Sequence, residues 1–197
     1  MSFEKLTQII STVIPLPIDN VDTDQIIPAR FLKSINREGF GDNLFRDWRY
    51  DTSNEPIMGF VLNDSQINGK ILVAGRNFGC GSSREHAAWA IYDYGIRVVL
   101  STSFADIFKN NALNIGLLPI EVPENFIEKI FDLFAVKKKL NLKVNLQEQQ
   151  VEIINTDEKV GFDISSYKKN CLLNGIDDID YLVLKTDRIE EFEQGIK

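Results

Sequence analysis

The stretch from residue 75 to 88, GRNFGCGSSREHAA, limits the possible folds more than any other part of the chain. It follows a short apolar run at 69–75 that predicts a buried strand, and it leads into a predicted helix at 84–95. Gly79 and Gly81 allow a sharp turn with positive φ and a close backbone approach to a ligand. Junctions of this kind bind ligands in α/β proteins, because the N-terminus of the helix presents unpaired backbone N–H groups.

The residues after this junction predict two further strands and a helix. Apolar β-formers at 96–101 and 117–122 predict strands, and 103–116 predicts a helix between them. Ser103 is the expected N-cap of this helix, and Gly116 is the residue expected to end it. A strand-helix-strand-helix-strand order at this spacing predicts a βαβαβ unit with parallel strands and right-handed crossovers.

The flanking segments complete the expected fold. We expect an N-terminal strand at 11–18 that its prolines cut short, and a long loop at 36–58 that contains several aromatic side chains. The C-terminal part predicts a helix at 124–138, a hairpin at 142–154, a strand at 159–164 and closing helices at 165–175 and 187–195. The sequence therefore predicts one compact α/β domain over residues 1–197, with the loop at 36–58 as its mobile part.

Composition excludes several classes of protein. A net charge of −7 argues against binding to the nucleic-acid backbone, which requires a basic surface. The N-terminus lacks the basic region of a signal peptide, and no apolar run approaches the length of a membrane span. The two cysteines, Cys80 and Cys171, cannot form a disulfide framework or hold an iron–sulfur cluster by themselves. We therefore expect a cytoplasmic protein without a membrane or nucleic-acid partner.

Two local interpretations of the glycine-rich stretch remain open. Ser82 and Glu85 have the spacing of a capping box, in which the serine caps a helix and the glutamate bonds back to it. Arg84 favours a ligand site instead, because a cation in the first helical turn opposes the helix dipole unless an anion binds there. The stretch has neither the third glycine of a dinucleotide-binding motif nor the G-K-[ST] of a phosphate loop. It also lacks the G-x-S-x-G elbow of an esterase.

A second cluster consists of Asp19, Asp22 and Asp24 around Thr23. Three carboxylates so close together could bind calcium, but the glycine and terminal glutamate of a calcium loop are missing. A solvated turn, in which the aspartates bond to nearby backbone groups, explains the cluster equally well.

Four stretches together resemble the bacterial small subunits of 3-isopropylmalate dehydratase, which belong to the aconitase superfamily. The stretches occur in matching order, and the similarity extends over about residues 5 to 195. They are NVDTDQIIPARFL (20–32), GFGDNLFRDWRY (39–50), GRNFGCGSSREHAAWAIYDYGIRVV (75–99) and SFADIFKNNALNIGLLPI (103–120). The resemblance implies an aconitase-type β/β/α swivelling domain that covers an active site built mainly by a separate large subunit. In such heterodimers the large subunit carries a [4Fe-4S] cluster, and the small subunit is active only together with it.

The resemblance also implies a reaction and roles for particular residues. The reaction is dehydration of 2-isopropylmalate and rehydration to 3-isopropylmalate in leucine biosynthesis. Ser82 would act as the catalytic base in its alkoxide form, and Ser83 would donate a hydrogen bond to the dicarboxylate substrate. Arg84 would hold a substrate carboxylate and help to stabilise the alkoxide. Asp24 matches an active-site aspartate of the superfamily, and Thr23 beside it is a weaker candidate.

Substrate choice is expected to depend on the loop IIPARFL. Isopropylmalate carries an apolar substituent, so Ile26, Ile27 or Phe31 would contact it. Arg30 or Arg37, if either pointed inward, would favour a tricarboxylate substrate instead. The open alternatives are the small subunit of homoaconitase or of another small-diacid hydratase, and an anion-binding domain without catalysis.

Overall fold

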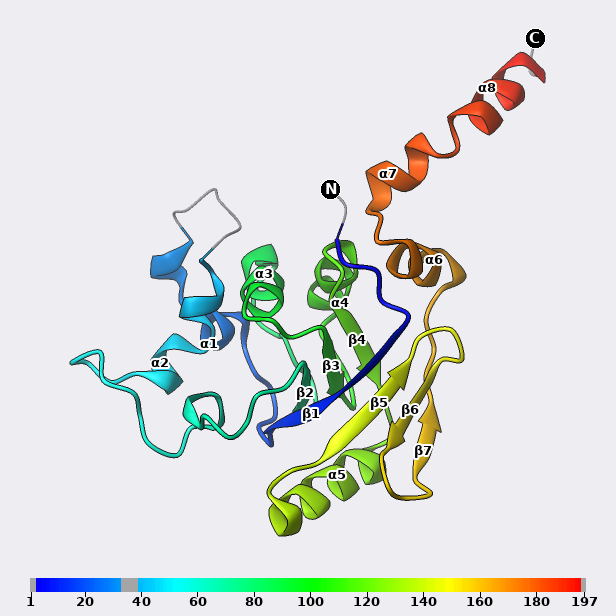
Figure 1. Cartoon of the computed structure of the whole chain (residues 1–197). Helices are drawn as coiled ribbons and strands as arrows, with labels where there is room; N and C mark the ends of the chain where they lie inside the picture. The colour runs from blue at the N-terminus through cyan, green and yellow to red at the C-terminus, as the bar shows by residue number, and fades with distance from the viewer. Residues whose placement is uncertain (1–2, 33–38, 196–197) are drawn as a thin grey trace.

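The computed structural model describes residues 3–32 and 39–195, and a seven-stranded sheet runs through this part of the chain. The strand order is β4-β3-β2-β1-β5-β6-β7 (Figure 1). The strands are β1 (Gln8–Leu16), β2 (Ile71–Ala74), β3 (Val98–Ser101), β4 (Leu118–Glu121), β5 (Asn141–Asn145), β6 (Gln150–Ile153) and β7 (Lys159–Gly161). Strands β1 to β4 are parallel, whereas β5, β6 and β7 pair antiparallel. The α/β class and the parallel βαβαβ unit are therefore confirmed.

Strand β1 joins the two halves of the sheet. Its residues 13–16 pair with β2, and its residues 8–12 pair with β5 in the opposite direction. The strand begins three residues before the expected segment, runs through Pro15 and ends just before Pro17. Of the two prolines, only Pro17 therefore marks the end of the strand.

Helices cover both faces of the parallel part of the sheet (Figure 1). Leu72 and Ala74 point to one face, where they pack with α3 (Glu85–Asp93) and α4 (Asp106–Asn114). Ile71 and Val73 point to the other face, where they pack with α5 (Glu124–Lys137). Successive strand residues face opposite sides, so covering both sides requires an apolar residue at every position of β2.

The remaining helices are short or lie near the C-terminus. They are α1 (Thr23–Ile26), α2 (Arg46–Arg49), α6 (Ser166–Asn174), α7 (Asp178–Val183) and α8 (Thr186–Gly195), with 3₁₀ turns η1 (Ala29–Phe31), η2 (Gly41–Asn43) and η3 (Val61–Asn63). The expected helix at 187–195 corresponds to α8, whereas α7 was not predicted. No helix within the described residues is both long and apolar enough to cross a bilayer.

The described part of the 36–58 loop, from residue 39 onward, packs against the core. Leu44 and Phe45 have no exposed surface, and the Phe45 ring stacks on that of Trp48 with 5.4 Å between ring centroids. The mobility expected for this loop stays a prediction, and Arg37 lies outside the described residues.

Arg49 organises this packed segment from inside. Its side chain is 8% exposed, and its Nη1 lies 3.3–3.5 Å from the carbonyl oxygens of Gly41, Asp42 and Leu44, to which it donates. The Asn63 amide donates back to the Arg49 carbonyl at 2.6 Å. The guanidinium thus donates to three backbone carbonyl groups; that of Gly41 also accepts the Leu44 N–H of η2, at 3.1 Å.

We expect Arg49→Met to lower the free energy of unfolding by about 1–3 kcal/mol, because it removes the guanidinium that donates to the carbonyl groups of Asp42 and Leu44. Chemical denaturation of the purified chain measures this loss. The matched control is Arg46→Met, whose guanidinium stacks over the Tyr50 ring at 4.0 Å and should change stability by about 0.5 kcal/mol or less. Equal losses in the two variants would contradict the role assigned to Arg49.

Candidate active site

Three loops meet beyond the carboxyl ends of β1, β2 and β3. Isolated bridges join Asp22 to Cys80 and Phe78 to Phe104, so the loops continue the parallel pairing past the sheet. The backbone N–H of Thr23 donates to the carbonyl of Cys80 at 2.9 Å. The DTD cluster and the glycine-rich stretch therefore lie side by side, although about 60 residues separate them in the sequence.

The glycines of the loop have the positive φ expected, +77° at Gly79 and +93° at Gly81. Side chains of the protein itself lie directly against each glycine. A Cβ at Gly79 would clash with the Phe108 ring, and one at Gly81 would clash with the Asp22 carboxylate. The glycines therefore allow close packing of the loop on α4 and on the DTD segment.

Of the two interpretations left open for the glycine-rich stretch, the structure does not form the capping box. Helix α3 begins at Glu85 with Arg84 as its N-cap, and the Arg84 side chain makes no capping hydrogen bond. The Glu85 carboxylate accepts a hydrogen bond from Trp89 Nε1 at 3.1 Å. Ser82 lies too far before the helix to cap it, and its hydroxyl has another partner.

That partner is Thr23, the first residue of α1. The two hydroxyl oxygens lie 3.1 Å apart, and the Ser82 backbone N–H donates to Thr23 Oγ1 at 3.2 Å. Thr23 is 1% exposed, whereas Ser82 and its neighbour Ser83 are exposed. Ser82 is thus exposed on one side and hydrogen-bonded to the buried Thr23 on the other.

Arg84 forms an ion pair with Asp24, which also accepts the Ala29 backbone N–H at 3.2 Å. The Arg84 Nη1 is buried and, apart from this ion pair, has no hydrogen-bond partner among the described residues. A cation at the start of a helix is stabilised by a nearby anion, and in this structure Asp24 is that anion. The site thus brings together Ser82, Ser83, Arg84, Asp24 and Thr23.

The hydrogen bond from Arg84 lowers the pKa of Asp24, and this effect outweighs the partial burial that opposes it. A lowered folded-state pKa means that the pair adds stability above the ordinary carboxyl pKa, and that this stability is lost as pH falls through the lowered value. We expect NMR titration to show Asp24 titrating below free aspartate, and Arg84→Met to return its pKa toward the ordinary value. An unchanged Asp24 pKa in that variant would contradict the assignment.

The loop at 26–32, which was expected to determine substrate specificity, begins with side chains that face the core. Ile26 and Ile27 have no exposed surface and belong to the core, so neither reaches a ligand in this conformation. Phe31 is half-buried and remains at the surface. Arg30 forms an ion pair with Asp47 of α2, and its guanidinium lies 4.7 Å from the centre of the Phe31 ring.

The other aspartates of the cluster have local structural partners. Asp22 caps α1 in a capping box with Gln25, and Asp19 forms an ion pair with Arg76 at 3.0 Å. Within residues 3–32 and 39–195, no three His, Cys, Asp or Glu side chains are grouped to hold a metal ion. Burial and the nearby Asp22 carboxylate raise the pKa of the Cys80 thiol, which keeps it protonated.

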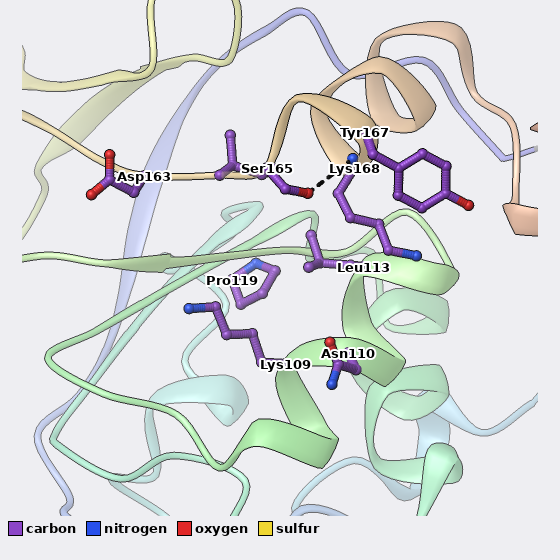
Figure 2. A pocket seen from close by; sticks show the side chains of 9 residues that line it. Lys109, Asn110, Leu113, Pro119, Asp163, Ser165, Tyr167 and Lys168 are labelled. Carbon is purple, nitrogen blue, oxygen red and sulfur yellow. Dashed lines mark hydrogen bonds between the residues drawn. The ribbon is translucent and has the colours of Figure 1, made fainter.

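A cavity of about 590 Å³ lies elsewhere, between α4, β4 and the segment 163–168 (Figure 2). Its two lysines already have acidic partners. Lys109 pairs with Glu121 at 2.9 Å, and Lys168 pairs with Asp178 at 2.5 Å. None of the site residues predicted from the sequence lines this cavity, so we place the candidate site at the loops beyond the strands.

Comparison with known proteins identifies the family. Residues 3–125 match the family of the aconitase C-terminal domain. The 3-isopropylmalate dehydratase small subunit of Christiangramia forsetii is 55% identical, over 97% of this chain and 93% of that protein. The corresponding protein of Cytophaga hutchinsonii is 57% identical, over 98% and 96%.

A solved structure agrees with both relatives. A crystal structure of 3-isopropylmalate dehydratase from Methanocaldococcus jannaschii is 26% identical, covers 95% of this chain and 99% of its own, and superposes with a TM-score of 0.66. The expected swivelling-domain fold is thereby confirmed. This chain belongs to the aconitase C-terminal domain family and, within it, to the small subunits of 3-isopropylmalate dehydratase.

Proposed function

We propose that the chain is the small subunit of a 3-isopropylmalate dehydratase, which converts 2-isopropylmalate to 3-isopropylmalate through isopropylmaleate in leucine biosynthesis. The relatives named above match almost the whole chain at 55% and 57% identity. The observation in the structure that supports the proposal most directly is the exposed Ser82 hydroxyl beside Arg84 at the meeting point of three loops.

Dehydration beside a carboxylate requires a base for the carbon-bound proton and a cation for the charge that develops. In our proposal Ser82 takes that proton, and Arg84 binds a substrate carboxylate through its exposed edge. The Arg84 side chain is 21% exposed, so a carboxylate can reach it while Asp24 holds it from the other side. Ser83, which is exposed next to Ser82, donates a hydrogen bond to the bound substrate.

The large subunit is the proposed partner, and the [4Fe-4S] cluster is proposed to be bound there. The described residues of this chain do not fit that group, because no metal-binding cluster of side chains occurs among them. When bound on the partner, the cluster supplies a Lewis acid for the departing hydroxyl group. We further propose a cytoplasmic protein that folds as one domain, since β1 hydrogen-bonds to both halves of the sheet.

Reconstitution tests the proposed function. The purified chain is mixed with a cluster-loaded large subunit, and the absorbance of isopropylmaleate is followed. The pair should consume isopropylmaleate, whereas each subunit alone should not. A mixed sample no faster than the large subunit alone would refute the assignment.

The same assay separates the alternative substrates. Arg30 is neutralised by Asp47 and lies against Phe31, an arrangement that favours an apolar substituent over a third carboxylate. Isopropylmaleate should therefore react faster than homoaconitate or aconitate. An anion-binding domain without catalysis would instead bind a dicarboxylate by itself and show no turnover with the large subunit.

A further inference from the structure

We propose that Thr23 is a positioning residue, whose hydroxyl orients Ser82 Oγ and stabilises it in the deprotonated form. The proposal rests on the proposed function, in which Ser82 is the base. This role differs from the substrate-binding role expected from the sequence. Thr23 is 1% exposed, and its hydroxyl contacts the Ser82 hydroxyl.

Thr23 is held firmly enough to position another residue. Its backbone N–H donates to Cys80 at 2.9 Å, and its backbone carbonyl accepts from Ile27 at 3.0 Å. The Asp22 carboxylate caps the helix that begins at Thr23. The threonine is thus attached both to α1 and to the glycine-rich loop, and its position depends on neither segment alone.

The hydrogen bonds around Thr23 determine where its single hydroxyl proton goes. The Ser82 backbone N–H donates to Thr23 Oγ1 at 3.2 Å, which uses acceptor capacity and leaves the proton to be donated. Two acceptors lie within reach, the Ser82 carbonyl at 3.5 Å and Ser82 Oγ at 3.1 Å. The shorter distance favours donation to Ser82 Oγ.

This contact changes strength with the protonation state of Ser82. While Ser82 carries its proton, either hydroxyl can donate to the other. Once Ser82 is an alkoxide, only Thr23 can donate, and a hydrogen bond to a charged acceptor is the stronger kind. A bond that favours the charged form lowers the pKa of its acceptor. The substrate proton passes to Ser82 Oγ, and Thr23 keeps its own proton throughout.

Two variants of Thr23 separate the hydroxyl from the methyl group. Thr23→Val keeps the volume and removes the donor, whereas Thr23→Ser keeps the donor and removes the methyl group. In the reconstituted two-subunit enzyme we expect Thr23→Val to lower kcat about 100-fold, as removal of one oxyanion donor does elsewhere. KM should change about twofold or less, because the carboxylate ligands of the substrate remain. The rise of kcat with pH should move to higher pH, since Ser82 loses the bond that stabilises its charged form.

Thr23→Ser should keep kcat within a few-fold of wild type, although the lost methyl group lowers Tm. If packing were the role of Thr23, the order would reverse, and valine would be the more active replacement. Thr23→Val with wild-type kcat, or Thr23→Ser as inactive as Thr23→Val, overturns the proposal.

Ser82→Ala separates this proposal from the one on which it rests. Turnover that survives Ser82→Ala contradicts the role of Ser82 as base, and the role of Thr23 fails with it. Turnover lost in Ser82→Ala but retained in Thr23→Val overturns the role of Thr23 alone. Binding of every variant to the large subunit, measured by gel filtration, shows whether each has folded.

Discussion

Replacing Ser82 with alanine should lower kcat of the reconstituted enzyme by about 10²–10⁴-fold, the usual contribution of a general base. Steady-state turnover of isopropylmaleate measures this loss. Tm should stay close to wild type, because Ser82 is exposed and does not cap α3. A capping serine would instead cost about 1 kcal/mol of stability when replaced by alanine.

Ser83→Ala is the matched control for that variant. Ser83 is equally exposed and adjacent in the chain, but the hydroxyl that meets Thr23 belongs to Ser82. We expect Ser83→Ala to raise KM more than it lowers kcat, since its proposed role is to hold substrate. Equal losses of kcat in the two variants would contradict the assignment of the base to Ser82.

Replacing Arg84 with lysine should reduce kcat/KM about 100-fold, even though the positive charge is kept. A planar guanidinium can pair with Asp24 on one side and bind a substrate carboxylate on the other, whereas an ammonium group cannot. The loss should appear in KM, because Arg84 binds a substrate carboxylate, and also in kcat, because Arg84 is the proposed cation for the charge that develops. Steady-state kinetics at several substrate concentrations separate the two constants.

Arg76→Lys is the control for Arg84. Arg76 belongs to the same loop, and its ion pair with Asp19 lies on the surface, where lysine serves nearly as well. We expect kcat/KM within about twofold of wild type, as for a surface pair. An Arg84→Lys variant as active as this control would show that charge alone suffices, and it would contradict the need for a guanidinium that contacts Asp24 and the substrate together.

Local patterns predicted the strands at the centre of the fold well and the residues that cap the helices poorly. The apolar runs of β2, β3 and β4 were located to within two residues, because strands buried on both faces leave a continuous apolar signal. Ser103 was expected to cap a helix, and a helix cap was one of the two interpretations left open for Ser82; the observed N-caps are Ala105 and Arg84. Ser82 meets Thr23, and Ser103 accepts the Asn77 backbone N–H at 2.9 Å. In both cases a partner distant in sequence replaced the local one.

At the candidate site, too, the sequence predicted residue types but not the contacts between residues that are distant in the chain. Residue types at the loop identified Arg84 as a cation in need of an anion, but periodicity and spacing carry no sign that the anion is Asp24, 60 residues earlier. Nor could they show that Ile26 and Ile27 face the core, since a helix as short as α1 has no detectable period. Arg49 was missed because its carbonyl partners carry no side-chain signal. Helix α7 was missed because it is six residues long.

The position of β1 in the middle of the sheet has a consequence for how the protein folds. Its two partners, β2 and β5, begin 63 and 133 residues after its own first residue. Parallel pairing cannot start from a tight turn, and contacts so distant in sequence slow folding because long loops must close first. During synthesis, β1 and the adjacent DTD segment therefore lack part of their partners until the chain has been made as far as residue 145. We expect the half-site formed by Thr23 and Ser82 to appear late in refolding, together with protection of the β1 amides from hydrogen exchange.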